Sequence, residues 1–135
     1  MFEQMELKTK QRDALYDITG DIYEIVRRSG VTNGLCTVFV PHTTAAVTIN
    51  ENADPDVTRD LLGKLRSLIP KEDGYRHMEG NSDAHLKASL LGASEQIIIR
   101  GGRLVLGTWQ GVYFAEFDGP RTRKVIVSVM DGGAE

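Results

Sequence analysis

The sequence predicts one domain of the α+β class. Its 135 residues can bury a single hydrophobic core but are too few for two. Hydrophobic residues make up 41% and charged residues 26%, which is typical of a globular protein and not of a disordered chain. The predicted elements run strand, helix, two strands, helices and several further strands, without the regular alternation of a doubly wound parallel sheet.

The first predicted elements are a strand over residues 3–9 and a helix after it. In the strand, apolar Met5 and Leu7 alternate with charged side chains, the pattern of a half-exposed strand. The helix has Asp17 as a candidate cap and Gly30 at its C-terminal end. Its apolar positions recur at helical spacing: Ile18, Ile22, Ile25 and Val26.

Two β-rich runs follow, residues 35–40 and 45–50. Pro41 separates them because it cannot donate a ladder hydrogen bond. The pair Asp54-Pro55 then predicts the start of a second helix, a cap followed by proline in the first turn. An apolar stripe runs along this helix until Pro70 ends it: Val57, Leu61, Leu62, Leu65 and Leu68.

The second half of the chain predicts one short helix and then sheet. Asn81 or Ser82 can cap a helix that runs through Leu91 and closes at Gly92, with His85 in its first turn. Four further strands are predicted, over residues 96–100, 104–106, 111–117 and 124–130.

Charge and hydropathy exclude several classes of function. The net charge of −3 and the isoelectric point near 5.6 leave no basic surface for nucleic acid. No apolar run approaches the roughly 20 residues that span a bilayer, and the N-terminal segment lacks the layout of a signal peptide, so we expect a cytoplasmic protein without a membrane partner. The single cysteine, Cys36, rules out zinc sites built on paired thiolates, and its place in a strand favours a buried structural thiol.

Three histidines, His42, His77 and His85, are the strongest functional signal. All lie in segments rich in Gly, Asn, Asp and Thr and poor in core residues. Neutral imidazole is a common zinc ligand, and three imidazoles leave a tetrahedral ion one open position for water or substrate. Their spacing matches no established metal motif, so the fold or a neighbouring subunit must bring them together. The alternative is that each is an ordinary surface or core histidine.

Acidic and amide side chains crowd the same segments. Glu51 and Asp83 are the candidate catalytic or supporting carboxylates, since a metal-bound histidine often donates its second nitrogen to such a group and a metal-bound water needs a base. Capping and the helix dipole explain Asp83 equally well. Asn81, at a helix start, and Arg121 are candidates for holding a phosphate or carboxylate. Trp109 is either a ligand platform or a packing residue.

Three long motifs, in order along the chain, resemble those of the YjbQ-like family: PHTTAAVTINENADPDV, HMEGNSDAHLKASLLG and LGTWQGVYFAEFDGPRTRKV. The resemblance implies a β-sandwich-like core of mixed sheets with a few helices packed outside, assembly as a homotrimer and a site near the subunit boundaries. It assigns the family's histidines, acidic positions and GPR arginine to His42, His77, His85, Glu51, Asp83 and Arg121.

The family's assigned activity is that of a secondary thiamine-phosphate synthase, which joins a pyrimidine diphosphate to a thiazole phosphate and releases pyrophosphate. Enzymes that release a diphosphate generally use magnesium, held by carboxylates and water, whereas three imidazoles favour zinc or another divalent transition metal. The ligand set therefore argues for a transition metal and against the chemistry that the name implies.

Three hypotheses follow from these residues. The first is a metal-dependent enzyme acting on a phosphorylated or otherwise anionic small molecule, by this condensation or by hydrolysis with metal-activated water. The second is a non-catalytic trimer that binds a metal or an anion, and the third is a purely structural trimer. A carboxylate beside the open position of the metal favours the enzyme over the other two.

Overall fold

The computed structural model describes residues 1–133 and confirms the α+β class, with three helices and eight strands. The helices are α1 (Thr19–Ser29), α2 (Pro55–Leu68) and α3 (Ser82–Leu91). The strands are β1 (Phe2–Lys8), β2 (Ala14–Asp17), β3 (Gly34–Phe39), β4 (Ala45–Glu51), β5 (Ser94–Arg100), β6 (Arg103–Leu104), β7 (Gln110–Glu116) and β8 (Thr122–Asp131). Within residues 1–133, no helix is long and apolar enough to cross a membrane.

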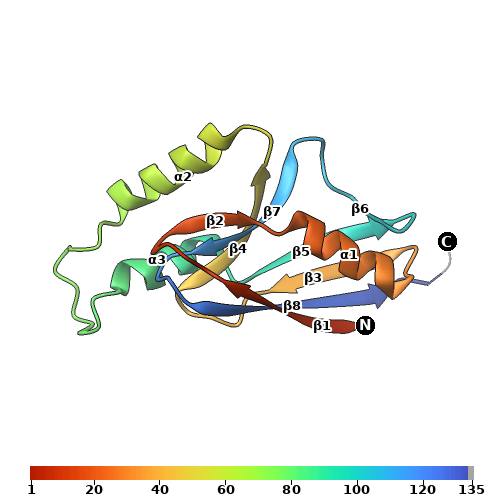
Figure 1. The fold of residues 1–135 in the computed structure, drawn as a ribbon, viewed down its shortest axis with the longest axis horizontal. Coiled ribbons are helices and arrows are strands. Elements are labelled where there is room, and N and C mark those ends of the chain that lie inside the picture. Colours follow the sequence, from red (N-terminus) through yellow and green to blue (C-terminus); the bar gives the residue numbers. More distant parts are fainter. Residues whose placement is uncertain (134–135) are drawn as a thin grey trace.

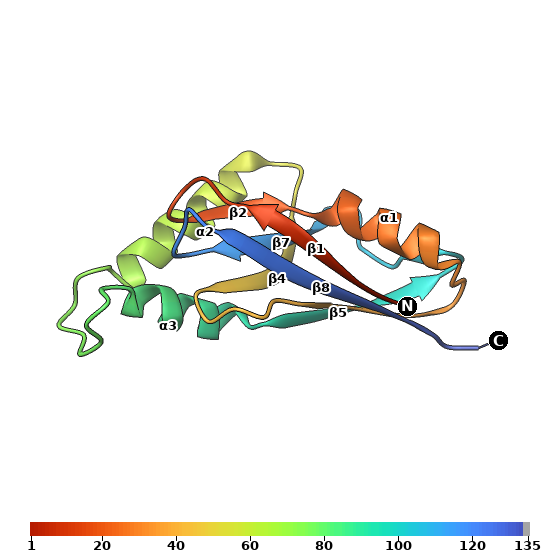
Figure 2. The same ribbon diagram turned by 60° about the horizontal axis from the view of Figure 1, so that its bottom comes forward.

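The strands form two sheets that pack face to face. One sheet has the order β1-β8-β3-β5-β6 and the other the order β2-β7-β4. Every strand pairing described is antiparallel, so the expectation of mixed sheets is wrong. Figures 1 and 2 show the larger sheet on one side of the molecule and the smaller sheet with α1 and α2 on the other.

The core lies between the two sheets and under α1. Alternate residues of β8 point inward, and Val125, Val127 and Val129 are buried there while their neighbours face outward. Phe114 of β7 is fully buried on the other side. The predicted apolar face of α1 completes this core, because Ile22, Ile25 and Val26 are all buried.

The start of α1 differs from the prediction and its end agrees with it. A short strand, β2, occupies the residues before the helix and pairs with β7, which the sequence pattern did not indicate. Ile18 takes the cap position, and Asp17 holds the first turn by accepting hydrogen bonds from Thr19 N and Oγ1 at 3.0 and 2.6 Å. Gly30 ends the helix with a φ of 70°, the left-handed conformation that glycine adopts without strain.

Helix α2 is capped as expected but only partly covered. Asp54 accepts a hydrogen bond from Asp56 N at 2.9 Å, and Pro55 stands in the first turn. Leu62 and Leu65 pack on a small satellite core beneath the helix. No residue of α2 is fully buried, and the side chain of Leu68 is 63% exposed. Within this chain, the helix therefore leaves part of its apolar stripe open to solvent.

Three connections meet at one end of the sandwich and create the site described below. They are the β3–β4 connection at residues 40–44, the α2–α3 connection at residues 69–81 and the β7–β8 connection at residues 117–121. The sheet register brings them together: β3 ends beside the start of β5, and β4 starts beside the end of β7. Helix α3 packs on β4 at the same end (Figure 2).

Gly34 and Gly63 provide a matched test of this packing. A Cβ at Gly34 would lie 2.0 Å from the backbone oxygen of Met130, because β3 and β8 approach closely there. Gly63, inside α2, has no neighbouring atom within 4 Å of an added Cβ. We expect Gly34→Ala to lower the free energy of unfolding by about 1–3 kcal/mol. Gly63→Ala should raise it by about 0.5–1 kcal/mol. Urea titration at one protein concentration measures both, and equal values for the two variants would contradict the described register.

Candidate functional site

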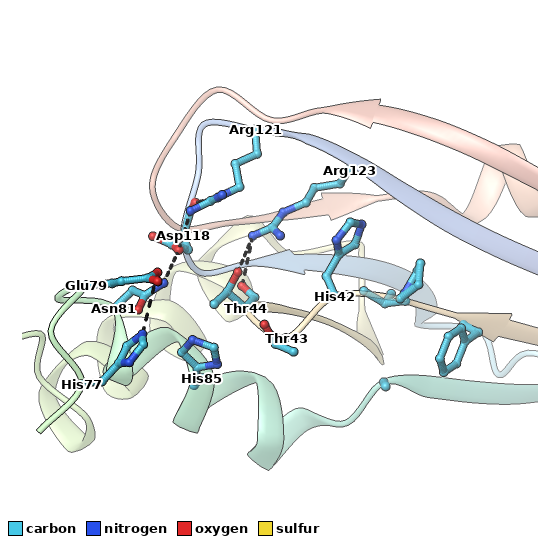
Figure 3. A pocket seen from close by; sticks show the side chains of 14 residues that line it. His42, Thr43, Thr44, His77, Glu79, Asn81, His85, Asp118, Arg121 and Arg123 are labelled. Carbon is cyan, nitrogen blue, oxygen red and sulfur yellow. Dashed lines mark hydrogen bonds and ion pairs between the residues drawn. The ribbon is translucent and has the colours of Figure 1, made fainter. Parts of the chain in front are cut away.

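A cavity of about 680 Å³ opens where the three connections meet, and all three predicted histidines line it (Figure 3). His42 comes from the β3–β4 connection, His77 from the α2–α3 connection and His85 from the first turns of α3. The other charged and amide groups of the lining are Glu79, Asn81, Asp118, Arg121 and Arg123. The fold thus brings residues 42, 77, 81, 85 and 121 to the lining of one cavity.

His77 and His85 form the closest pair of imidazoles. Their ring centroids lie 5.4 Å apart with the planes at 87°, an edge-to-face arrangement. Glu79 extends the group, since its Oε2 lies 3.8 Å from Nε2 of His77. The side chain of His77 is 43% exposed and can change its rotamer without unpacking the core.

His42 faces the cavity from the opposite side and is held as a neutral base. Its Nε2 accepts a hydrogen bond from the backbone N–H of Lys124 at 2.9 Å, which places the ring proton on Nδ1. Burial lowers the pKa of His42, and the nearby positive charge of Arg123 lowers it further. The ring therefore stays uncharged at neutral pH, as a metal ligand must.

The histidines fit a metal in type and in proximity but are not arranged around one point. Two imidazoles that share a tetrahedral zinc, with Zn–N distances of about 2.0–2.1 Å, place their ring centroids roughly 5 Å apart, close to the 5.4 Å of His77 and His85. However, no group of three or more His, Cys, Asp or Glu side chains within residues 1–133 is arranged to hold a metal. Binding would require His77 to turn and His42 to release the N–H of Lys124.

A buried ion pair fixes Arg123 in the wall of the cavity. Its Nε donates to Oε1 of Glu116 at 2.8 Å, and its Nη2 donates to Oε2 of Glu116 and, at 2.9 Å, to Oγ1 of Thr44. The side chain of Glu116 is 0% exposed and that of Arg123 only 5%. Burial raises the pKa of Glu116, but hydrogen bonds from Arg123, Thr9 and the N–H of Asp118 outweigh it and leave the pKa below its usual range. The Nη1 group of Arg123 bonds to none of residues 1–133 and is available to a ligand.

Asn81 has an unsatisfied oxygen beside the cavity. Its Nδ2 donates to Oδ2 of Asp118 at 2.8 Å, and Asp118 also accepts from Nη2 of Arg121 at 2.8 Å. A flipped amide would set its oxygen against the Asp118 carboxylate, so the orientation is determined. Oδ1 of Asn81 is then buried without a partner among the described residues, and the residue is 92% buried, being 8% exposed. A buried acceptor of this kind calls for a donor, from a ligand or from water.

The structure does not bring Glu51 or Asp83 to the cavity. Glu51 lies at the far end of β4, where its backbone oxygen accepts from the hydroxyl of Tyr113. Asp83 is fully buried beneath α3 and is bound by Arg12 and Lys87, each through contacts of 3.0 Å. We expected one of these carboxylates to lie beside the metal, and within this chain neither does. The helix-start pattern correctly placed Asp83 in the first turn of α3, but it did not predict on which side of the helix the carboxylate lies.

Glu79, Asp118 and Arg123 complete the site, and the sequence pattern did not single them out. Several acidic residues lie near the histidines in the sequence, and the fold of the α2–α3 connection is what puts Glu79 in the cavity lining beside His77. Arg123 follows Arg121 by two residues in GPRTRK, a spacing that puts two side chains on the same side of an extended chain, and both line the cavity although β8 begins only at Thr122. That spacing was the available signal for Arg123.

Two further residues lie outside the cavity. Cys36 is 0% exposed, which confirms the buried thiol, and burial raises its pKa to about 11. Trp109 is 62% exposed in the β6–β7 connection, so it does not pack in the core of this chain, and it does not line this cavity.

Comparison with known proteins agrees with the fold. A family model described as UPF0047 protein YjbQ-like matches residues 3–132. UPF0047 protein YugU of Bacillus subtilis is 49% identical over 131 residues, covering 96% of this chain and 99% of its own length. A UPF0047 protein of Methanocaldococcus jannaschii is 51% identical over 130 residues, covering 96% and 94%.

Solved structures show the same architecture. An uncharacterised YjbQ/UPF0047 family protein of Clostridium acetobutylicum superposes with a TM-score of 0.94 at 58% identity, covering 95% of this chain and 99% of the other. A YbjQ-like protein of unknown function from Sulfolobus solfataricus gives 0.94 at 36% identity, covering 97% and 96%.

Glu116 provides the test of the buried ion pair. We expect Glu116→Gln to lower the free energy of unfolding by about 3–5 kcal/mol at pH 7, because the positive charge of Arg123 stays buried without its partner. The pKa of Glu116 is depressed in the folded state, so its contribution is present above the ordinary value of 4.5 and is lost as pH falls through the folded value. The difference between variant and wild type should therefore shrink in acid. Urea unfolding at pH 7 and at pH 3 measures it.

The matched control is Glu24→Gln, which removes an exposed carboxylate paired with Arg27. It should leave the unfolding curve almost unchanged at both pH values. A Glu116→Gln variant that behaves like this control would show that the ion pair is not structural.

Proposed function

The chain belongs to the YjbQ-like UPF0047 family, and we propose that it is a metal-dependent enzyme acting on a phosphorylated or otherwise anionic small molecule. The observation that supports this most is the gathering of three imidazoles and two guanidinium groups around one cavity. Its volume of about 680 Å³ is in the range of small-molecule sites. The reaction class is transfer or hydrolysis at a phosphorylated group.

The charge balance of the lining supports a role for a metal. Arg121 is paired with Asp118 and Arg123 with the buried Glu116, so Glu79 is the one carboxylate of the described lining that no arginine compensates. An anionic substrate would gain little from such a wall alone. A divalent ion on His42, His77 and His85 would make the site positive, and the imidazole set favours zinc over magnesium.

The residues of the chain take distinct parts in this proposal. The bound ion would supply Lewis acidity toward an oxygen of the substrate or of water. Nη1 of Arg123 and the guanidinium of Arg121 would hold the anionic group. Glu79, beside His77, would take up the proton that an attacking water loses. Oδ1 of Asn81 would accept a hydrogen bond from a hydroxyl, an amine or water.

Hydrolysis fits these residues better than the thiamine-phosphate condensation does. A free carboxylate beside the imidazoles is what an attacking water needs, whereas the condensation needs no general base for water. Release of a diphosphate also favours magnesium, which the three imidazoles do not. We retain the condensation as a second activity to be measured, because the family resemblance implies it.

A non-catalytic metal- or anion-binding role is the alternative. It is favoured by one observation, that the histidine nitrogens are not arranged around a single point in this chain. A sensor or a storage protein could order its ligands on binding, while an enzyme benefits from ligands already in place. Activity measurements on the metal-loaded protein decide between them.

We include a homotrimer and a cytoplasmic location in the proposal. The outer face of the larger sheet carries exposed apolar side chains, with Ile98 60% and Met130 63% exposed on either side of Leu35. Phe39, on the same face, also lines the cavity, so a subunit covering this face would border the site. The buried free thiol of Cys36 suits a reducing compartment.

We expect purified protein to carry close to one transition-metal ion per chain, since one cavity holds the three imidazoles. His42→Ala, His77→Ala and His85→Ala should each lower metal affinity by at least tenfold. Elemental analysis and titration of the metal-free protein with Zn²⁺ measure this. In the wild type, the amide signal of Lys124 should move on zinc binding, because His42 releases it.

Metal-loaded protein should hydrolyse members of a panel of phosphate esters, and chelation should remove the activity. The two thiamine precursors form a separate arm of the panel. Glu79→Gln should keep the metal and lose most of the rate, whereas Glu72→Gln, in the same connection but outside the cavity, should lose neither. Negligible metal in the wild type, or metal without turnover in any arm, would rule out the enzyme.

The outer sheet face gives a separate prediction about assembly. Ile98→Lys places a charge in the exposed apolar row and should shift the trimer toward monomer. Gln96→Lys makes the same change of charge on the same strand next to that row and should disturb assembly less. Light scattering across a tenfold range of concentration measures the mass, and a monomeric wild type would contradict the proposal.

A further inference from the structure

A second cavity, of about 310 Å³, lies on the other side of α3 from the histidines. It is formed by the end of α2, by α3 and by the β1–β2 connection. The proposed reaction uses none of its charged side chains, which are Arg12, Asp13, Arg66, Lys71, Asp83 and Lys87.

The base of this cavity holds one more positive charge than negative charge. The carboxylate of Asp83 is already satisfied by Arg12, whose Nη1 and Nη2 donate to its two oxygens at 3.0 Å each. Lys87 adds a second cation, with Nζ 3.0 Å from Oδ2 of Asp83. Two cations therefore share a single buried anion.

The ammonium of Lys87 is the uncompensated group. Its side chain is only 3% exposed, yet Nζ donates to one acceptor in residues 1–133 and has two further N–H bonds to give. A buried charge without full compensation is costly, and lysine is almost never buried unless paired. Since Arg12 alone neutralises Asp83, packing of α3 does not require the second cation.

The rim adds to the positive charge. Arg66 and Asp13 pair with each other at 2.7 Å and cancel. Lys71 lines the cavity and forms no ion pair within the described residues. Asp118, which also acts on Arg12, is matched by Arg121 on the other side. The cavity thus has a balance of four cations to two carboxylates.

We propose that this second cavity binds a small oxyanion, with phosphate as the best fit and a carboxylate as the weaker alternative. Nζ of Lys87 holds the anion from the base and Lys71 holds it from the rim. Phosphate offers enough oxygens to use both of the free N–H bonds of Lys87 and the ammonium of Lys71 at once. This inference does not depend on the proposed reaction or on a metal.

The test is an NMR titration of metal-free, full-length protein with sodium phosphate at constant ionic strength. We expect saturable shifts of the backbone amides of Lys71 and Lys87, with a midpoint raised at least tenfold by Lys71→Glu. Lys64→Glu makes the same charge change on the exposed face of α2 outside the cavity and should move the midpoint less than twofold. Lys87→Met should abolish saturable phosphate binding. If the Lys87→Met variant does not fold, Lys71→Glu still tests the site.

Two controls separate the cavities and the ligands. His85→Ala alters the larger cavity and should leave this midpoint unchanged. Acetate in place of phosphate should bind at least tenfold more weakly. Equal midpoints for acetate and phosphate would mean that a carboxylate is the ligand and would overturn the assignment of phosphate. Shifts that grow linearly with phosphate, or equal midpoints for Lys71→Glu and Lys64→Glu, would overturn the site itself.

Discussion

The buried ion pair between Glu116 and Arg123 is the contact on which the rest of the site depends. It joins the last residue of β7 to the second residue of β8, and it draws in Thr9 from the β1–β2 connection and Thr44 from the β3–β4 connection. Three stretches far apart in sequence, at residue 9, at residue 44 and at residues 116–123, are thereby joined at one end of the sandwich. Breaking the pair would leave a buried charge without its partner, which is costly, so the pair opposes separation of these stretches.

Each wall of the main cavity is attached to that ion pair. The N–H of Asp118 donates to Oε2 of Glu116 at 3.1 Å, and Asp118 then positions Arg121 and Asn81. The N–H of Lys124, next to Arg123, holds His42. The α2–α3 connection is attached through Asn81, but within residues 1–133 no hydrogen bond ties the side chains of His77, Glu79 or His85 to this network. The guanidinium side of the cavity is therefore held in place by the buried ion pair.

Patterns that depend on neighbours along the chain were predictable from the sequence. The Asp54-Pro55 start of α2, the Gly30 end of α1 and the alternation of β8 all act within a few residues. The pairing of β2 with β7 was not predictable, because four residues carry too little periodicity. The side of α3 that Asp83 occupies depends on Arg12, 71 residues away in the chain, and no local pattern reports such a contact. The histidines could be recognised as a group, but their orientation could not.

The orientation of the histidines determines how tightly a metal can bind. His42 must exchange the N–H of Lys124 for the ion, and this loss opposes part of the gain from coordination. His77 must turn from its edge-to-face contact with His85 toward a common centre. Neither change breaks a hydrogen bond between Glu116 and Arg123. In the proposed function, the Glu116–Arg123 pair would keep the guanidinium side of the cavity in place while the histidines turn toward the ion.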